Sequence, residues 1–471
     1  MKTPVDENLS SIEIHPSSDR RNFLKKAAVG GLGLAFLAKS NDVSASIEYA
    51  SQKVSRSSAP TDLKITDLRV AHTTDGPILK IYTNQDIYGL GEVRDIADPR
   101  YALMIKSRIL GLNPCNVEQI FKIIKQFGGQ GRQGGGVSGI EMALWDLAGK
   151  AYGVPAYQLL GGKYRDKIRI YADTPSSKDP EVYATRMKYR MEQGFTFLKM
   201  DFGIGLIKDI PGALIGEKFW SGQSEWDQSK PGNLSNTKHP FTAIQITDLG
   251  LEKMVEYVDK VREIVGYEVP MAADHFGHFD TNTAIRLGNA LEKYQLAWLE
   301  DMVPWFYTEK WKEITHAINT PTLTGEDIFG KEEFIKLCDA HAVDMIHPDL
   351  ASAGGLLETK KIGDYAEEKG IAMAMHFAGT PVSFMANVHC AAATQNFIAL
   401  EHHDVDTPYW ENYVTGQKPL VEKGFAAVPE APGLGIDINE EVIKEHLKKD
   451  EKLFAPTDEW NNRNSWDRTW S

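Results

Sequence analysis

Six acidic or imidazole side chains recur about 25 residues apart in the second half of the chain, and each closely follows a short apolar run. These residues are Asp274, Glu300, Glu326, Asp349, His376 and Glu401. Side chains that follow consecutive strands of a parallel barrel converge on its carboxyl-terminal end, where they can bind a cation and move protons together. Scattered acids would not keep this register, so the spacing predicts an active site.

The first three of these residues predict a metal site. If Asp274, Glu300 and Glu326 lay together without a cation, each carboxylate would raise the pKa of its neighbours. Oxygen ligands that leave room for water and substrate favour Mg²⁺ over Zn²⁺. The alternative interpretation is that the three acids are helix caps or exposed loop charges, and their common register disfavours it.

Asp349 and His376 predict a proton-transfer pair. A carboxylate that binds one imidazole nitrogen fixes the tautomer and raises the basicity of the ring, which leaves the other nitrogen to move a proton. Lys199 lies in an earlier apolar run, two residues before Asp201, and strand alternation puts both on one side. Lys199 could neutralise a substrate carboxylate or act as a base, and it could equally form an ion pair with Asp201.

Eight short apolar runs, alternating with helical patterns, must position these side chains. The runs are 168–171, 195–200, 269–273, 297–299, 322–324, 345–346, 371–375 and 397–400. This alternation predicts an α/β fold, a closed (β/α)7β TIM-like barrel over residues 166–415. A segment at about 203–249, rich in Gly, Ser, Asn and Trp, is predicted to be an insertion in that barrel.

The residues before the barrel have a different pattern. Strand-like runs at 64–70, 78–83 and 86–93, with Gly89 and Gly91 as breakers, precede helical patterning from 101 to 152. This order predicts an α+β capping domain over residues 62–165. We expect the last segment, 416–471, to return to this cap.

Composition narrows the class of protein. The 471 residues are 42% hydrophobic and 25% charged, which excludes a disordered, collagen-like or polytopic membrane protein. A net charge of −13 argues against a nucleic-acid partner. Cys115, Cys338 and Cys390 are too few for a disulfide framework, and none belongs to a Cys-x-x-Cys pair.

The N-terminus has the pattern of an export signal. Arg20 and Arg21 precede a short apolar stretch at 27–38 and a small-residue cleavage pattern at 43–45. We therefore expect a twin-arginine signal peptide over 1–45, a flexible leader over 46–61, a periplasmic location, and no membrane segment in the mature protein. A disordered basic N-terminus or an uncleaved anchor is the alternative.

Several stretches resemble the enolase superfamily, in particular its mandelate racemase/muconate lactonizing enzyme-like branch and the acid-sugar dehydratases within it. The resemblance runs from about residue 62 to about residue 440. It is carried by residues 140–150 (IEMALWDLAGK), Gly153-Val-Pro, Leu159-Leu-Gly-Gly-Lys, Trp298-Leu-Glu-Asp, Thr324-Gly-Glu, Pro348-Asp, Gly354-Gly and Pro432-Gly-Leu-Gly.

The resemblance implies roles for the residues found above. Asp274, Glu300 and Glu326 match the family's metal ligands, and His376 with Asp349 matches its histidine–aspartate pair. Glu401 matches the glutamate that hydrogen-bonds a substrate carboxylate oxygen as an enediolate forms. Relatives are often dimers or octamers, so we also expect a homo-oligomer.

Two departures from the family pattern bear on the reaction. Family racemases carry Lys-x-Lys where this chain has Lys199-Met-Asp201, which disfavours racemisation by bases on two faces. Asp201 could still replace the second lysine as a catalytic base. After Asp274 the chain has His275-Phe-Gly-His278. Either histidine could be a proton donor, a substrate contact or a packing residue, and we favour His278 as the donor.

Together these features predict Mg²⁺-dependent dehydration of an acid sugar, an aldonate or aldarate, to a 2-keto-3-deoxy acid. His376 would remove the proton α to the carboxylate, and His376, His275 or His278 would protonate the leaving hydroxyl group. The alternatives are an epimerase, racemase or cycloisomerase that uses the same enediolate, and a periplasmic acid-sugar binding protein without turnover.

Overall fold

The computed structural model describes residues 59–215, 245–274, 280–462 and 464–465. The predicted export signal, residues 46–58 of the predicted leader, the inner part of the predicted insertion, and both His275 and His278 lie outside the described residues. Within the described residues, every helix is too short or too polar to cross a membrane.

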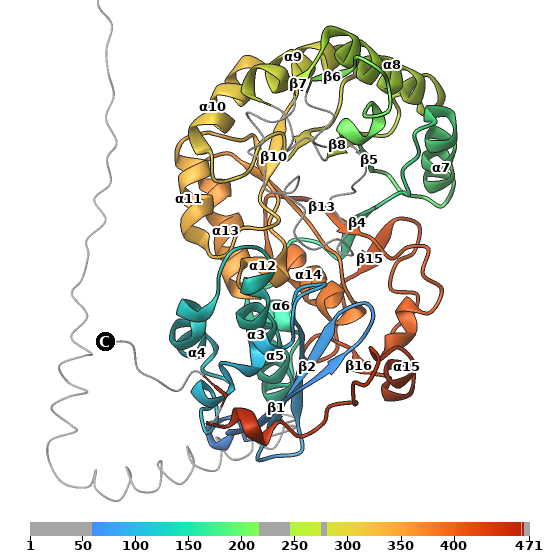
Figure 1. Cartoon of the computed structure of the whole chain (residues 1–471). Coiled ribbons are helices and arrows are strands. Elements are labelled where there is room, and N and C mark those ends of the chain that lie inside the picture. Colours follow the sequence, from blue (N-terminus) through green and yellow to red (C-terminus); the bar gives the residue numbers. More distant parts are fainter. Residues whose placement is uncertain (1–58, 216–244, 275–279, 463, 466–471) are drawn as a thin grey trace, which may run out of the picture. The chain divides into compact units, whose positions relative to one another are not determined.

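Among the described residues, eight parallel strands form one closed barrel (Figure 1). They are β4 (Lys167–Ala172), β5 (Leu198–Asp201), β8 (Met271–Asp274), β9 (Leu299–Glu300), β10 (Thr322–Thr324), β11 (Met345–Ile346), β12 (Ala372–Met375) and β13 (Phe397–His402). Each strand pairs with the next in this order, and β13 pairs with β4 to close the ring. The predicted (β/α)7β barrel is confirmed, and each of its strands overlaps one of the predicted apolar runs.

Helices connect these strands and lie around them (Figure 1). They are α7 (Pro180–Glu192), α8 (Asp248–Val265), α9 (Thr281–Leu291), α10 (Thr308–Ala317), α11 (Lys331–Asp339), α12 (Leu350–Ala353), α13 (Leu356–Glu368) and α14 (Pro381–Ala393). Helix α9 shows why they form. The Asp280 side chain caps its first turn by accepting a hydrogen bond from the Thr283 N–H, 3.0 Å away, and Ala284, Leu287 and Leu291 bury one face.

The inside of the barrel is filled by an aromatic layer. The Tyr171 and Phe197 rings lie 5.6 Å apart, and the Phe197 ring stacks 4.7 Å from Trp298. Ala272, Ala374 and Ala399 belong to the same buried cluster, so small side chains leave room for the large rings. This packed layer lies inside the barrel, beneath the carboxyl-terminal ends of the strands.

The cap begins with an antiparallel sheet of β1 (Ile65–His72), β2 (Pro77–Thr83) and β3 (Tyr88–Glu92), followed by α3 (Arg100–Leu103), α4 (Val117–Ile124) and α5 (Gly135–Tyr152). Gly89 and Gly91 lie inside β3, so the expectation that they break the strand is wrong. A Cβ atom at either residue would lie 2.0 Å from a backbone oxygen of α5. These glycines therefore allow β3 and α5 to pack closely.

Two buried cap carboxylates bind the amino-terminal ends of barrel helices. Glu92, at the end of β3, accepts hydrogen bonds from the backbone and hydroxyl groups of Thr380 and Ser383 at the start of α14, at 2.5–3.1 Å. Glu141, on α5, accepts from the backbone N–H groups of Leu356 and Leu357 in α13, at 2.6 and 3.0 Å. Both side chains accept hydrogen bonds from N–H groups that the first turn of a helix leaves unpaired, so these contacts fix the cap on the barrel.

The described ends of the predicted insertion pair with each other. Strands β6 (Leu214–Ile215) and β7 (Gln245–Ile246) are antiparallel, and α8 begins soon afterwards because the Thr247 hydroxyl caps the Gly250 N–H at 3.1 Å. Beyond the barrel, the chain adds β14 (Val414–Thr415), β15 (Phe425–Ala427), β16 (Asp437–Ile438) and α15 (Glu440–Glu445); the short helix α6 (Ala156–Leu159) precedes the barrel.

The residues after the barrel contact the cap. The Lys106 ammonium group donates a hydrogen bond to the Thr457 hydroxyl at 2.8 Å, and Lys80 lies 2.9 Å from the carboxylate of Glu440. Strand β15 also pairs antiparallel with β4, the first strand of the barrel. The segment after β13 is therefore tied both to the cap and to the barrel.

Candidate active site

The described site residues predicted from sequence all lie at the carboxyl-terminal ends of barrel strands. They are Lys199 and Asp201 (β5), Asp274 (β8), Glu300 (β9), Glu326 (after β10), Asp349 (after β11), His376 (after β12) and Glu401 (β13). An isolated backbone bridge between Asp349 and His376 extends the β11–β12 pairing beyond the strands and keeps the two residues side by side. The strand register therefore gathers these side chains at one end of the barrel.

Carboxylates in this site form overlapping groups with the spacing of metal ligands. Ligand atoms of Asp274, Glu300 and Asp301 lie within 4.8 Å of one another, and so do those of Glu300, Glu326 and His347. Glu300 is fully buried and belongs to both groups. The sequence did not single out Asp301 or His347, although each adjoins a predicted element; Asp301 turns with a positive φ of 49° directly after Glu300.

The electrostatics of these groups fit a divalent cation. Burial, together with the charges of Asp274 and Glu300, raises the pKa of Glu326 to about 7, although Arg94 opposes this shift. Burial and the nearby carboxylates of Glu326 and Glu300 hold the pKa of Asp301 well above its usual range. Glu300 Oε1 is buried and lies 2.6 Å from His347 Nδ1. Crowded, buried oxygen ligands of this kind are suited to a hard divalent cation.

We expect divalent cations to raise the melting temperature of the protein, and to raise it more at about pH 8 than at about pH 6. The pKa of Glu326 is raised from 4.5 to about 7. The folded state gains stability from this raised pKa. The gain is complete below about pH 4.5 and is lost as the pH rises through about 7. A bound cation restores stability most where the carboxylate is ionised. Thermal denaturation with MgCl₂ and with EDTA at both pH values measures this, and equal shifts would contradict the prediction.

Lys199 lies among the carboxylates as a cation. Its Nζ is 2.7 Å from Asp274 Oδ2, 2.6 Å from Glu401 Oε1 and 3.8 Å from Glu300 Oε2. Burial alone would lower the pKa of Lys199, but these carboxylates outweigh burial and hold it well above its usual range. The arrangement therefore favours the charge-neutralising role over the role of a base. Asp201, two residues further along, interacts electrostatically with Asp173.

His376 and Asp349 form a close pair. His376 Nδ1 lies 2.7 Å from Asp349 Oδ2, and its Nε2 faces Glu326 Oε2 at 3.3 Å. Burial lowers the pKa of His376 well below its usual range, and the positive charge of Arg94 adds to this effect. The imidazole is therefore neutral, which is the form that can accept a proton.

Arg94 is a cap residue that sequence reasoning did not assign to the site. Its guanidinium lies 2.9 Å from Asp349 Oδ2 and also contacts Asp95, and its side chain is 1% exposed. Asp349 in turn accepts a hydrogen bond from the Ser352 N–H at 3.0 Å. The cap thus helps to fix the carboxylate that orients His376. In the sequence, the one sign of this role is that Arg94 directly follows the predicted strand at 86–93.

Replacing Arg94 by Met should lower the free energy of unfolding by about 3 kcal/mol, because the buried carboxylates of Asp349 and Asp95 would lose their cation. Urea denaturation measures this loss. Lys122→Met, on the exposed face of α4, is the matched control and should change stability by less than about 0.5 kcal/mol. A loss no larger than that of the control would contradict the assigned contact.

The Glu401 carboxylate contacts Tyr171, Lys199 and His403. The Tyr171 hydroxyl donates a hydrogen bond to Glu401 Oε2 at 3.1 Å and lies 2.9 Å from His347 Nε2. Burial alone would raise the pKa of Glu401, but Lys199 and His403 hold it well below its usual range. The carboxylate is therefore ionised in this structure and can accept a hydrogen bond but not donate one.

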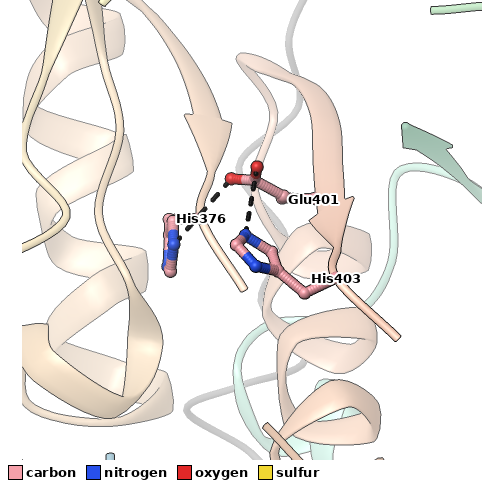
Figure 2. Close-up of side chains that lie close together, drawn as sticks. All are labelled: His376, Glu401 and His403. Carbon is pink, nitrogen blue, oxygen red and sulfur yellow. Dashed lines mark ion pairs between the residues drawn. The ribbon is translucent and has the colours of Figure 1, made fainter. Parts of the chain in front are cut away.

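Figure 2 shows Glu401 between two imidazole rings, with Oε2 4.0 Å from His376 Nε2 and Oε1 3.3 Å from His403 Nε2. Sequence reasoning missed His403. The signal that could have found it is strand alternation, since a residue two positions after Glu401 points to the same side.

Comparison with known proteins gives consistent matches along the chain. Residues 46–161 match the family described as mandelate racemase/muconate lactonizing enzyme, N-terminal domain, and residues 182–442 match the family described as enolase C-terminal domain-like. D-Xylonate dehydratase of Haloferax volcanii is 33% identical over 406 residues, which cover 83% of this chain and 91% of that protein. D-Mannonate dehydratase of Novosphingobium aromaticivorans is 28% identical over 409 residues, covering 82% and 96%.

A solved structure shows the same fold. The mandelate racemase/muconate lactonizing enzyme-like protein from Rubrobacter xylanophilus superposes with a TM-score of 0.72 at 32% sequence identity. The match covers 83% of this chain and 99% of that one.

Proposed function

Because the chain belongs to the mandelate racemase/muconate lactonizing enzyme family of the enolase superfamily, we propose that it is an acid-sugar dehydratase. Its reaction would be the Mg²⁺-dependent loss of water from an aldonate or aldarate, giving a 2-keto-3-deoxy acid. The observation that carries this proposal is the buried carboxylate group beside a neutral, carboxylate-bound histidine at the barrel end. The similarity to proteins named as dehydratases of four sugar acids, D-xylonate, D-galactonate, D-gluconate and D-mannonate, supports the substrate class.

Asp274, Glu300 and Glu326 would hold the Mg²⁺ ion, with Asp301 beside them. When bound, the ion would polarise the substrate carboxylate and make the adjacent C–H bond more acidic. The oxygen-rich donor set supports Mg²⁺ as the ion.

The chain's own residues would then move the proton. His376 Nε2 accepts the proton α to the carboxylate, while Asp349, fixed by Arg94, holds the ring through Nδ1. Lys199 supplies positive charge where negative charge develops on the substrate carboxylate. Glu401, which is ionised, keeps Lys199 in place through their 2.6 Å contact.

A screen of D-xylonate, D-galactonate, D-gluconate and D-mannonate with Mg²⁺, read as formation of a 2-keto acid, tests the proposal. We expect at least one acid to be dehydrated, with no product in EDTA. Formation of an epimer without a 2-keto acid would identify an isomerase. Binding without any chemical change would identify an acid-sugar binding protein.

We also propose that the protein is exported through the twin-arginine pathway to the periplasm. The order of Arg20-Arg21, the apolar stretch 27–38 and the small residues 43–45 supports this location. Replacing both arginines by Lys should leave the full-length chain in the cytoplasm, whereas the wild type should yield a mature N-terminus near Ser46. Intact Met1 in the periplasmic fraction would contradict the cleavage.

A further inference from the structure

Carboxylates and imidazoles alternate along one side of the barrel mouth. The row consists of Asp349, His376, Glu401, His403 and Asp173, which come from the ends of β11, β12, β13 and β4. Glu401 Oε2 lies 4.0 Å from His376 Nε2, and Glu401 Oε1 lies 3.3 Å from His403 Nε2. His403 Nδ1 in turn lies 3.7 Å from Asp173 Oδ2. Each imidazole thus has a carboxylate near its Nδ1, Asp349 for His376 and Asp173 for His403. Both rings lie beside Glu401, toward which their Nε2 atoms point (Figure 2).

Strand alternation explains why His403 joins this row and His402 does not. Glu401 and His403 point to the barrel mouth, whereas the intervening His402 is buried among Phe377, Phe384 and Trp410. Its ring centroid lies 4.4 Å from that of Trp410. The His403 side chain is 36% exposed, so a molecule that enters the mouth can reach it.

The charges around His403 keep a proton on its ring. Burial alone would lower the pKa of His403, and Lys199 also acts in that direction, but Glu401 and Asp173 raise it to about 9. At neutral pH the ring is therefore an imidazolium that can donate a proton. A protonated imidazole next to the proposed base can take the acid role within one site.

Distance allows the two rings to act on one substrate. The ring centroids of His376 and His403 lie 5.3 Å apart, at a steep interplanar angle of 62°. Groups at this separation can reach adjacent carbon atoms of the same small molecule. The base and the acid need not be the same histidine.

We propose that His403 is the catalytic acid of the dehydration, the group that protonates the departing β-hydroxyl. This inference rests on the proposed function. In the reaction, His376 takes the C2 proton, and the electron pair of that C–H bond first moves into the carboxylate to give an enediolate. That electron pair then forms the C2–C3 double bond as the C3–O bond breaks. His403 Nε2 gives its proton to the leaving oxygen, which departs as water. The resulting enol gains a proton at C3 and loses the proton of its C2 hydroxyl, which gives the 2-keto-3-deoxy acid.

The test separates protonation of the leaving group from every other step. His403→Asn should lower kcat for water loss from the sugar acid identified in the screen by about 10²–10⁴-fold. The same variant should still exchange the C2 proton with D₂O. It should also still release fluoride from the matching 3-deoxy-3-fluoro acid, because fluoride leaves without a proton from the enzyme. His403→Gln provides a second variant, and His316→Gln, on the exposed face of α10, is the control with wild-type turnover.

Other outcomes would overturn the inference. Unchanged water loss in both His403 variants would exclude His403 as the acid. An equal loss on the hydroxy acid, the fluoro acid and C2 exchange would show that His403 only supports the site. If His275→Asn or His278→Asn alone spared the fluoro acid, that histidine would be the acid. Failure of the proposed function itself looks different, because the wild type would then neither exchange the C2 proton nor eliminate either group.

Discussion

Glu300→Gln should abolish Mg²⁺-dependent turnover while the barrel remains folded. Glu300 is fully buried, belongs to both carboxylate groups and accepts a hydrogen bond from Trp298 Nε1 at 3.0 Å, which an amide oxygen can still accept. The substitution keeps the side-chain shape but removes one negative charge from the metal ligands. Because metal polarisation contributes several kcal/mol, we expect turnover to fall by roughly 10³-fold or more. Steady-state kinetics at saturating Mg²⁺ and circular dichroism measure the two effects.

The matched control is Glu309→Gln, which removes the same charge from the exposed first turn of α10. It should leave turnover and metal binding unchanged. Isothermal titration with Mg²⁺ should show that Glu300→Gln, unlike the control, binds the ion weakly. Wild-type turnover in Glu300→Gln would overturn the ligand assignment.

His376→Asn should stop exchange of the α-proton. Asparagine can still hydrogen-bond Asp349 but cannot accept a proton at neutral pH, so the base is lost while its neighbours stay in place. General-base catalysis contributes about 10²–10⁴-fold, and we expect dehydration to fall by at least that factor. Nuclear magnetic resonance of the C2 proton in D₂O follows the exchange directly.

Asp349→Asn provides a comparison for that result. It removes the charge that orients His376 and leaves Arg94 with one carboxylate fewer, so exchange should slow without stopping. Exchange at the wild-type rate in His376→Asn would instead place the base at Lys199 or Asp201.

The barrel and the regular spacing of the residues at its mouth were predictable from sequence because both depend on local pattern. Apolar runs at strand length set the strands, and the residue after each run must lie at the barrel mouth. For that reason Asp274, Glu300, Asp349 and His376 lie where the pattern placed them. Their chemical roles remain predictions.

Contacts between distant segments were not predictable in the same way. Arg94 contacts Asp349 across the same boundary at which Glu92 and Glu141 bind α14 and α13, and these contacts span more than 200 residues of sequence. Likewise, Gly89 and Gly91 resembled strand breakers because their role depends on α5, which lies about 50 residues further along the chain. The pattern of a single sequence does not indicate which distant segments will pack against each other.

The protonation states of the site residues could also be inferred only from the structure. From sequence, Lys199 could have been a base, and a base needs a lowered pKa. Its contacts with Asp274 and Glu401 raise that pKa instead. The sequence places His403 two residues after Glu401. Its contact with Asp173, however, exists because β13 pairs with β4 and closes the barrel.

The most direct test of the central claim follows the C2 proton of an acid sugar in D₂O, with wild-type protein in Mg²⁺ and in EDTA. In Mg²⁺ we expect the C2–H signal to disappear as a 2-keto-3-deoxy acid carrying deuterium at C3 forms, and we expect EDTA to prevent both changes. If every acid in the screen retained its C2 proton at saturating Mg²⁺, the claim that this site breaks that bond would be wrong.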